Sequence, residues 1–150
     1  RIGAGMTAEL GTMKVTEQIA ALRSMAADPV KKLVVPKLAA TLLMLPILTL
    51  LGDLLGVLGG LVIAVSELGL TPEFYWNDVL SALTIDDVAS GVAKSLFFAL
   101  FITVVACHHG LTADGGADGV GRATTNTVVV ASILVLVSDF FLTKLLYLLP

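Results

Sequence analysis

Three long apolar segments constrain this chain more than any other feature. They run from about 38 to 65, from 88 to 107 and from 127 to 149. A helix needs about 20 apolar residues to cross the hydrocarbon core of a bilayer, and each segment has that length. Hydrophobic residues make up 57% of the 150 positions and charged residues only 14%, too apolar a balance for a soluble domain of this size. We therefore expect an all-α, polytopic membrane bundle with three transmembrane helices.

The distribution of charge predicts an orientation. Residues 66–91 contain five acidic residues and no Lys or Arg, whereas six of the nine basic residues precede the first apolar segment: Arg1, Lys14, Arg23, Lys31, Lys32 and Lys37. Basic residues near the ends of spans stay in the cytoplasm. The N-terminal stretch and a loop at 108–125 are therefore expected inside, and the 66–91 loop and the C-terminus outside. The aromatic group 74–76 favours the headgroup level, which predicts an outer loop lying along the membrane surface.

The segment 7–27 predicts a helix that does not span. Polar and apolar residues alternate in it, and Glu9, Met13 and Glu17 share one face at i, i+4 and i+8. Asp28-Pro29 is expected to end this helix and to cap a new one beginning at Pro29. An amphipathic helix of this kind lies on headgroups or docks on a partner protein. Its mixed charge differs from the Lys/Arg-rich faces that bind anionic lipid.

Small and ionisable residues interrupt the apolar spans. Gly52, Gly56 and Gly60 form two small-xxx-small steps, which predict close packing of another helix on that face. Pro46 predicts tilt or a kink in the first span. Ionisable groups inside a membrane are costly and usually face the bundle interior or water. Asp139 is therefore a candidate for function, whereas Asp53 suits a buried hydrogen-bonding role as well as a transport role.

No pattern for chemistry is visible in the sequence. The glycine-rich stretch 115–121 lacks the Lys of a phosphate-binding loop, so we expect a tight turn in which Thr124 or Thr125 caps the third span. His108 and His109 have no partners at metal-ligand spacing. Cys107, alone in the chain, is read as a small buried hydrophobe. We expect no catalytic residue, no metal and no cofactor.

Three blocks of sequence, in order along the chain, carry a resemblance. They are 8–19 (AELGTMKVTEQI) with Asp28-Pro29 and Val35-Pro36, 119–129 (GVGRATTNTVV), and 139–143 (DFFLT). Together they resemble the MlaE-type permeases, the membrane subunits of bacterial ABC transporters that move phospholipids or related lipids across the cell envelope. The resemblance implies a single permease domain over 1–150 in the inner membrane. It also implies that this chain is the C-terminal three-span part of a five-span subunit.

The resemblance also implies partners and site residues. The helix from Glu9 to Arg23 would be a cytoplasmic coupling helix in a groove of a separate ATPase, with these contact residues: Glu9, Met13, Lys14, Glu17 and Arg23. A second permease copy would enclose a lipid cavity near the outer leaflet, and a periplasmic lipid-binding protein would complete the system. The resemblance assigns no lipid-cavity residues, so the polar transport candidates come from the sequence itself: Asp53 and Asp139 in the spans and Arg122 in the inner loop.

Two other functions fit the same residues. An ion-coupled secondary transporter would use Asp53 or Asp139 as its proton carrier, and its transport would follow a pH gradient rather than ATP. A membrane scaffold would only recruit a cytoplasmic partner and would move no lipid.

Overall fold

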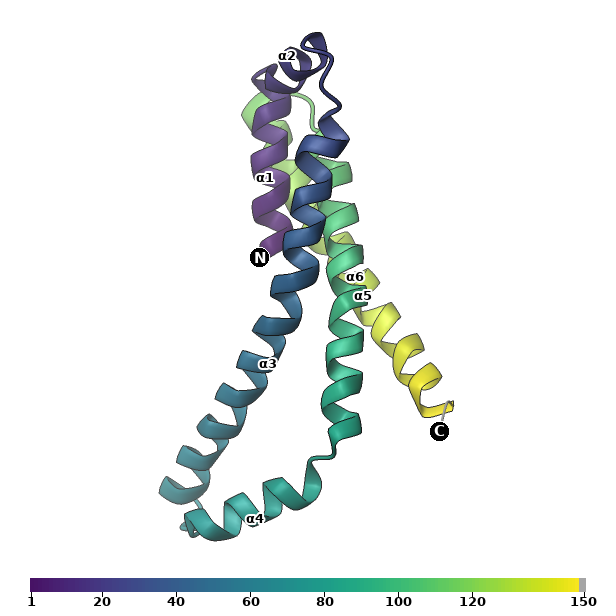
Figure 1. Cartoon of the computed structure of the whole chain (residues 1–150). Coiled ribbons are helices and arrows are strands. Elements are labelled where there is room, and N and C mark those ends of the chain that lie inside the picture. Colours follow the sequence, from purple (N-terminus) through teal and green to yellow (C-terminus); the bar gives the residue numbers. More distant parts are fainter. Residues whose placement is uncertain (149–150) are drawn as a thin grey trace. The chain divides into compact units, whose positions relative to one another are not determined.

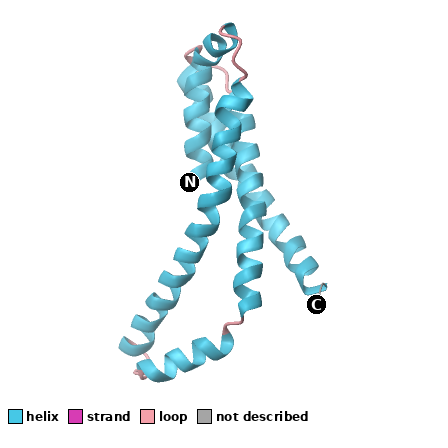
Figure 2. Cartoon of the chain, viewed as in Figure 1, coloured by secondary structure: helices cyan, strands magenta, loops and turns pink. Residues whose placement is uncertain are grey.

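The computed structural model describes residues 1–148, which form helices joined by short connections, with no strand in that range (Figures 1 and 2). The helices are α1 (Ile2–Val15), α2 (Gln18–Ser24), α3 (Val35–Ser66) preceded by a π-helical turn (Val30–Val34), α4 (Pro72–Ala82), α5 (Ile85–Leu111) and α6 (Gly116–Leu148). Three stretches are long and apolar enough to cross a membrane, Val30–Ser66, Ile85–Leu111 and Gly116–Leu145. They contain the predicted spans 38–65 and 88–107 and the predicted span 127–149 up to residue 145, and residue 149 lies outside the described residues. The all-α prediction is confirmed.

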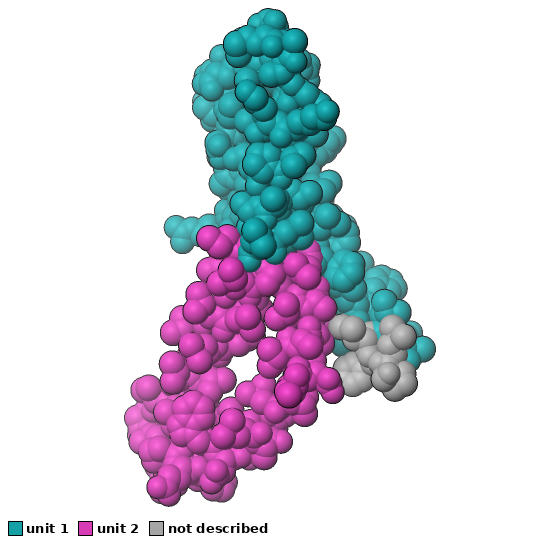
Figure 3. All heavy atoms as spheres, viewed as in Figure 1, with its two compact units in different colours: residues 1–43, 97–150 teal, residues 44–96 magenta. Residues whose placement is uncertain are grey.

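The chain divides into two compact units (Figure 3). The first contains residues 1–43 and 97–150, which place α1, α2 and α6 together with the start of α3 and the end of α5. The second contains residues 44–96, which hold the rest of α3, all of α4 and the start of α5.

The predicted helix at 7–27 is two helices, not one. α1 ends at Val15, and Glu17 has a φ of 61°, in the left-handed region that a helix cannot contain. Glu17 therefore does not continue the face of Glu9 and Met13, and that part of the prediction is wrong. The β-branched pair Val15-Thr16 favours a break here, because such residues lose side-chain freedom in a helix. Asp28 caps the next helical segment as predicted, since its Oδ1 accepts a hydrogen bond from the Val30 N–H at 2.9 Å.

The predicted inner loop at 108–125 is mostly helical. α5 continues to Leu111 and α6 begins at Gly116, so only residues 112–115 connect them. Thr124 and Thr125 are not caps, because their hydroxyls donate to the Val120 and Gly121 carbonyl oxygens one turn back, at 2.8 and 3.2 Å. The glycines at 115 and 116 take φ values of 93° and 68° and make the turn, whereas later glycines lie within the helix.

The core of the first unit is built from small side chains. Leu10 and Thr7 of α1 are fully buried against α5 and α6. The other buried apolar residues of these helices are Ala99, Ala106, Cys107 and Ala131, and Ala113 is buried in the connection between α5 and α6. A Cβ added at Gly110 would lie 2.7 Å from the Leu10 Cβ, so this glycine lets α1 and α5 approach closely. The large apolar residues face outward instead; Leu43 and Leu136 are 69% and 73% exposed, as bilayer-facing residues are.

Hydrogen bonds at helix ends organise the second unit. The Thr71 hydroxyl accepts from the Phe74 N–H and begins α4, which occupies much of the predicted outer loop. Asp87 and Thr84 form a reciprocal cap at the start of α5: Asp87 Oδ2 accepts from the Thr84 N–H at 3.1 Å, and Thr84 Oγ1 accepts from the Asp87 N–H at 3.3 Å. The Tyr75 hydroxyl donates to the Val57 carbonyl oxygen at 2.8 Å and joins α4 to α3.

Candidate functional site

A buried cluster of hydroxyl groups joins three helices of the first unit. The Thr7 Oγ1 of α1 lies 2.9 Å from the Thr127 Oγ1 of α6 and 3.1 Å from the Ala106 carbonyl oxygen of α5. The His109 Nδ1 lies 3.0 Å from the same Thr127 oxygen. Thr7 and Thr127 are fully buried. A buried hydroxyl that loses its hydrogen-bond partner costs free energy, so a shift of α1 that separated these groups would be unfavourable. The cluster therefore fixes the position of α1 between α5 and α6.

The hydrogen bonds of the cluster can run in either direction, depending on which ring nitrogen of His109 carries the hydrogen. If the His109 Nδ1 carries no hydrogen, Thr7 donates to Thr127 and Thr127 donates to the His109 Nδ1. If the His109 Nδ1 carries a hydrogen, it donates to Thr127, Thr127 donates to Thr7, and Thr7 donates to the Ala106 carbonyl oxygen. Every hydrogen in this order meets an acceptor. The alternative backbone acceptors, Gly3 O for Thr7 and Ala123 O for Thr127, both lie at 2.9 Å. The cluster is therefore fully satisfied.

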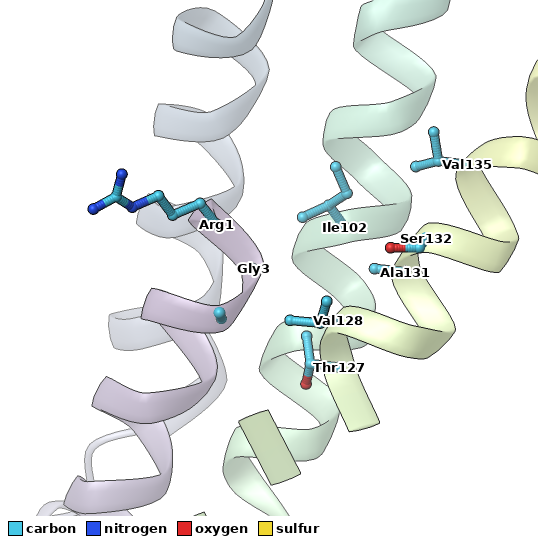
Figure 4. A pocket seen from close by; sticks show the side chains of 9 residues that line it. Arg1, Gly3, Ile102, Thr127, Val128, Ala131, Ser132 and Val135 are labelled. Carbon is cyan, nitrogen blue, oxygen red and sulfur yellow. The ribbon is translucent and has the colours of Figure 1, made fainter. Parts of the chain in front are cut away.

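A small hollow opens beside the cluster, between α1, α5 and α6 (Figure 4). Its volume is 180 Å³, and Thr127, Val128 and Ala131 contribute to its wall. Ligand pockets usually enclose about 300–1,000 Å³, so this space is a packing feature rather than a binding site. The Arg1 side chain extends away from α5 and α6 (Figure 4).

The candidate coupling residues divide between α1 and α2. Glu9 forms an ion pair with Lys37 of α3, and Met13 and Lys14 are half-buried. Glu17, which precedes α2, and Arg23, in the last turn of α2, are exposed, and the neighbouring apolar Met25 is 69% exposed. Ile19 of α2 is buried, which holds the short helix against the unit. Glu9 is also exposed, but it is held in the pair with Lys37. The exposed surface around α2 therefore consists of the candidates Glu17 and Arg23 together with Met25.

Asp53 lines a larger hollow that lies wholly within the second unit (Figure 3). Its volume is 680 Å³; α3 contributes Asp53 and Gly56, α4 contributes Trp76 and Leu80, and Asp87 lies at the start of α5. We call it the second-unit hollow. Among the side chains that the structure describes, no hydrogen-bond donor or cation contacts the Asp53 carboxylate. The structure therefore gives Asp53 no buried hydrogen-bonding role within this chain.

The other polar candidates lie apart from Asp53 in the chain. Asp139 is half-buried on α6, and its carbonyl oxygen accepts from the Thr143 hydroxyl at 2.6 Å. Arg122 lies in the second turn of α6 rather than in a loop, with its guanidinium beside Gly115. Asp139 and Arg122 belong to the first unit and Asp53 to the second.

The glycine face of α3 makes one close contact. A Cβ added at Gly60 would lie 2.6 Å from the Tyr75 hydroxyl oxygen, so this glycine makes room for the tyrosine that binds Val57. At Gly52 and Gly56 nothing described lies within 4 Å of such a Cβ, and both glycines line the second-unit hollow. Packing of a further helix on Gly52 and Gly56 stays a prediction.

The hydroxyl cluster is the feature that sequence reasoning missed. A signal for it exists in α1, where Gly3, Thr7 and Gly11 follow one another at i, i+4 and i+8 and are all buried. This is the same small-residue spacing as on α3. His109, set aside because it lacked metal-ligand partners, belongs to the cluster through Thr127.

The fold and these positions define a multi-pass membrane protein, whose described residues contain three helices able to span a bilayer and buried small-residue contacts between helices. The family model described as Permease MlaE matches residues 1–145. The chain therefore belongs to the MlaE permease family.

Individual relatives agree with this family. A probable ABC transporter permease protein of Rickettsia typhi is 42% identical over 147 residues, which cover 98% of this chain and 57% of the relative. A probable ABC transporter permease protein of a Synechocystis strain is 44% identical, with 98% and 56% covered. The intermembrane phospholipid transport system permease protein MlaE of Haemophilus influenzae is 34% identical over 148 residues, with 98% and 57% covered. The chain thus spans less than two thirds of the length of these relatives.

Proposed function

We propose that this chain is part of the membrane permease subunit of an ABC transporter that moves phospholipids or related lipids between bacterial membranes. The subunit is not an enzyme, and a separate cytoplasmic ATPase drives it. Membership of the MlaE permease family over residues 1–145 is the observation that carries this proposal. The name of the Haemophilus influenzae relative supports phospholipid as the cargo.

The transporter assembles from several chains. Two permease copies form the membrane core in the bacterial inner membrane, each bound to an ATPase, and a periplasmic lipid-binding protein exchanges lipid with them. The basic N-terminal stretch faces the cytoplasm, because Lys and Arg near spans stay inside. ATP binding closes the ATPase pair, and the helices attached to it move as rigid bodies that reshape the lipid path.

The exposed surface around α2 is the contact with the ATPase. Glu17 and Arg23 offer opposite charges beside the exposed thioether side chain of Met25, a combination typical of protein interfaces. The buried Ile19 fixes α2 to the first unit, so force applied to α2 reaches α1 and the hydroxyl cluster behind it. Met13 and Lys14, half-buried on α1, contribute at the edge of this contact.

Charge reversal tests this contact. In the complete permease co-expressed with its ATPase, the double variant Glu17→Lys/Arg23→Glu is expected to weaken ATPase binding to a tagged permease by about thirtyfold, because removing an interface hot spot costs about 2 kcal/mol. Quantitative affinity purification measures it. Glu73→Lys, an exposed acid on α4, is the matched control and should retain the ATPase fully. Unchanged retention in the double variant would contradict the proposed contact.

Glu9 requires a separate design, because it already pairs with Lys37. Glu9→Lys alone breaks the intramolecular pair, whereas Glu9→Lys/Lys37→Glu restores it with the charges exchanged. If the exchanged pair restores ATPase retention, Glu9 acts within the permease. If retention stays low, Glu9 contacts the ATPase directly.

A further inference from the structure

We propose that the second-unit hollow binds the ammonium end of a zwitterionic lipid headgroup, with Asp53 as its counter-ion. The inference rests on the proposed lipid transport and names the lipid class that one permease copy prefers. It assigns a site within a single copy, formed by α3, α4 and the start of α5.

The lining of the hollow combines the groups that recognise an organic ammonium ion. Asp53 and Asp87 supply negative charge, and Trp76 supplies the aromatic ring that binds ammonium groups best. The remaining wall is apolar, with Leu50, Leu54, Val57, Val79 and Leu80 among its residues. An apolar wall with a few polar groups is the usual construction of a small-molecule site, and 680 Å³ lies within the usual range of about 300–1,000 Å³.

The charge of the second unit favours a cation from outside the chain. Residues 44–96 contain six acidic residues and one basic residue, and no Lys or Arg occurs between Lys37 and Lys94. Asp53 has no cationic partner among residues 1–148. A carboxylate in a membrane span requires water or an opposite charge nearby. A lipid ammonium supplies that charge, whereas a lipid with a net negative headgroup meets repulsion.

A bound metal ion fits the hollow less well. Calcium requires six to eight oxygen ligands, and no group of three or more His, Cys, Asp or Glu residues in the described part of the chain could hold a metal. Asp87 Oδ2 already accepts hydrogen bonds from the N–H and the hydroxyl of Thr84. The apolar wall instead suits the hydrocarbon that adjoins a lipid headgroup.

The position of α4 keeps the hollow formed. The Tyr75 hydroxyl bonds to the Val57 carbonyl oxygen, and the absence of a side chain at Gly60 allows this approach. Trp76, the next residue, lies edge-on to Tyr75, with ring centroids 6.3 Å apart and an interplanar angle of 74°. The contact that joins α4 to α3 therefore also positions the Trp76 ring.

Lipid retention by the intact complex tests the inference. The complete permease with its ATPase is incorporated into bilayers of equal parts phosphatidylethanolamine and phosphatidylglycerol with identical acyl chains. Lipids retained on detergent extraction are counted by mass spectrometry. The wild-type complex is expected to retain phosphatidylethanolamine in excess. Asp53→Asn should lower that ratio by about tenfold, because it removes a charged partner from an apolar site.

Two further variants separate the possible outcomes. Asp53→Glu keeps the charge and should keep the preference, as should Asp78→Asn, an exposed acid of α4 outside the hollow. Equal retention of the two lipids by the wild-type complex overturns the inference even if a variant fails to assemble. An Asp53→Asn ratio equal to that of the wild type also overturns it. Both of these results leave the proposed function intact, whereas a complex that neither retains nor moves any lipid contradicts the proposed function itself.

Discussion

Replacing Gly119 by Ala is expected to destabilise the permease by about 3 kcal/mol or to prevent its folding. A Cβ at this position would lie 1.8 Å from the Asp114 carbonyl oxygen, which is a backbone atom. Overpacking costs about 1–3 kcal/mol when side chains can move aside, and a backbone carbonyl cannot do so. The turn at 112–115 and the first turn of α6 would have to rearrange together.

Gly121 provides the matched control for Gly119. It lies two residues further along α6, and nothing described lies within 4 Å of a Cβ added there. Alanine in a helix is favoured over glycine by about 0.5–1 kcal/mol, so Gly121→Ala should be neutral or stabilising. Thermal unfolding of the purified permease in detergent measures both variants. Equal melting temperatures for the two variants would show that the close approach at Gly119 is absent from the protein.

Replacing Thr127 by Val is the second change with a large expected effect. The two side chains have the same shape, but valine removes the hydroxyl that contacts both Thr7 and His109. Thr127 is fully buried, and leaving a buried polar partner unsatisfied costs about 1–3 kcal/mol. The melting temperature of Thr127→Val should therefore fall. Thr125→Val, on the exposed side of α6, removes only a hydroxyl bonded to its own helix and should have little effect.

A double-mutant cycle distinguishes the cluster from general loss of packing. Thr7→Val and Thr127→Val remove the two ends of the same contact between α1 and α6. Neighbours that share a hydrogen bond show coupling energies of about 0.5–3 kcal/mol, whereas independent sites are additive. Additive losses in unfolding free energy would contradict a shared cluster.

The spans could be predicted from the sequence because their signal is local. Length and hydropathy decide whether a segment can cross a bilayer, and neither depends on the rest of the fold. The ends of the helices were less predictable. Glu17 fits an amphipathic pattern and is a good helix former, so the sequence predicts a continuous helix there. In the structure, the Glu17 backbone is left-handed and the helix ends before it. Similarly, the glycines after residue 115 look like a loop, although Gly116 begins α6 and Gly119 and Gly121 lie within it.

The tertiary contacts could not be predicted because they join distant positions. Thr7 and Thr127 are 120 residues apart, and each is an ordinary threonine in its local sequence. The three glycines of α3 have the same spacing but different surroundings. Gly60 contacts Tyr75, whereas Gly52 and Gly56 line the second-unit hollow, and the spacing alone does not predict this difference. Asp53 was correctly singled out as an ionisable residue within a span. Its surroundings depend on how α4 folds back on α3, which no pattern within α3 contains.

ATP-driven lipid movement tests the central claim most directly. The complete permease and its ATPase are reconstituted into vesicles with a fluorescent phospholipid, and transfer is followed with and without ATP. The account predicts transfer that requires ATP hydrolysis, stops with a non-hydrolysable analogue and does not respond to an imposed pH gradient. Transfer that follows the pH gradient without ATP would instead indicate an ion-coupled carrier. No transfer in the presence of an active, bound ATPase would indicate a scaffold, and either result would contradict the account.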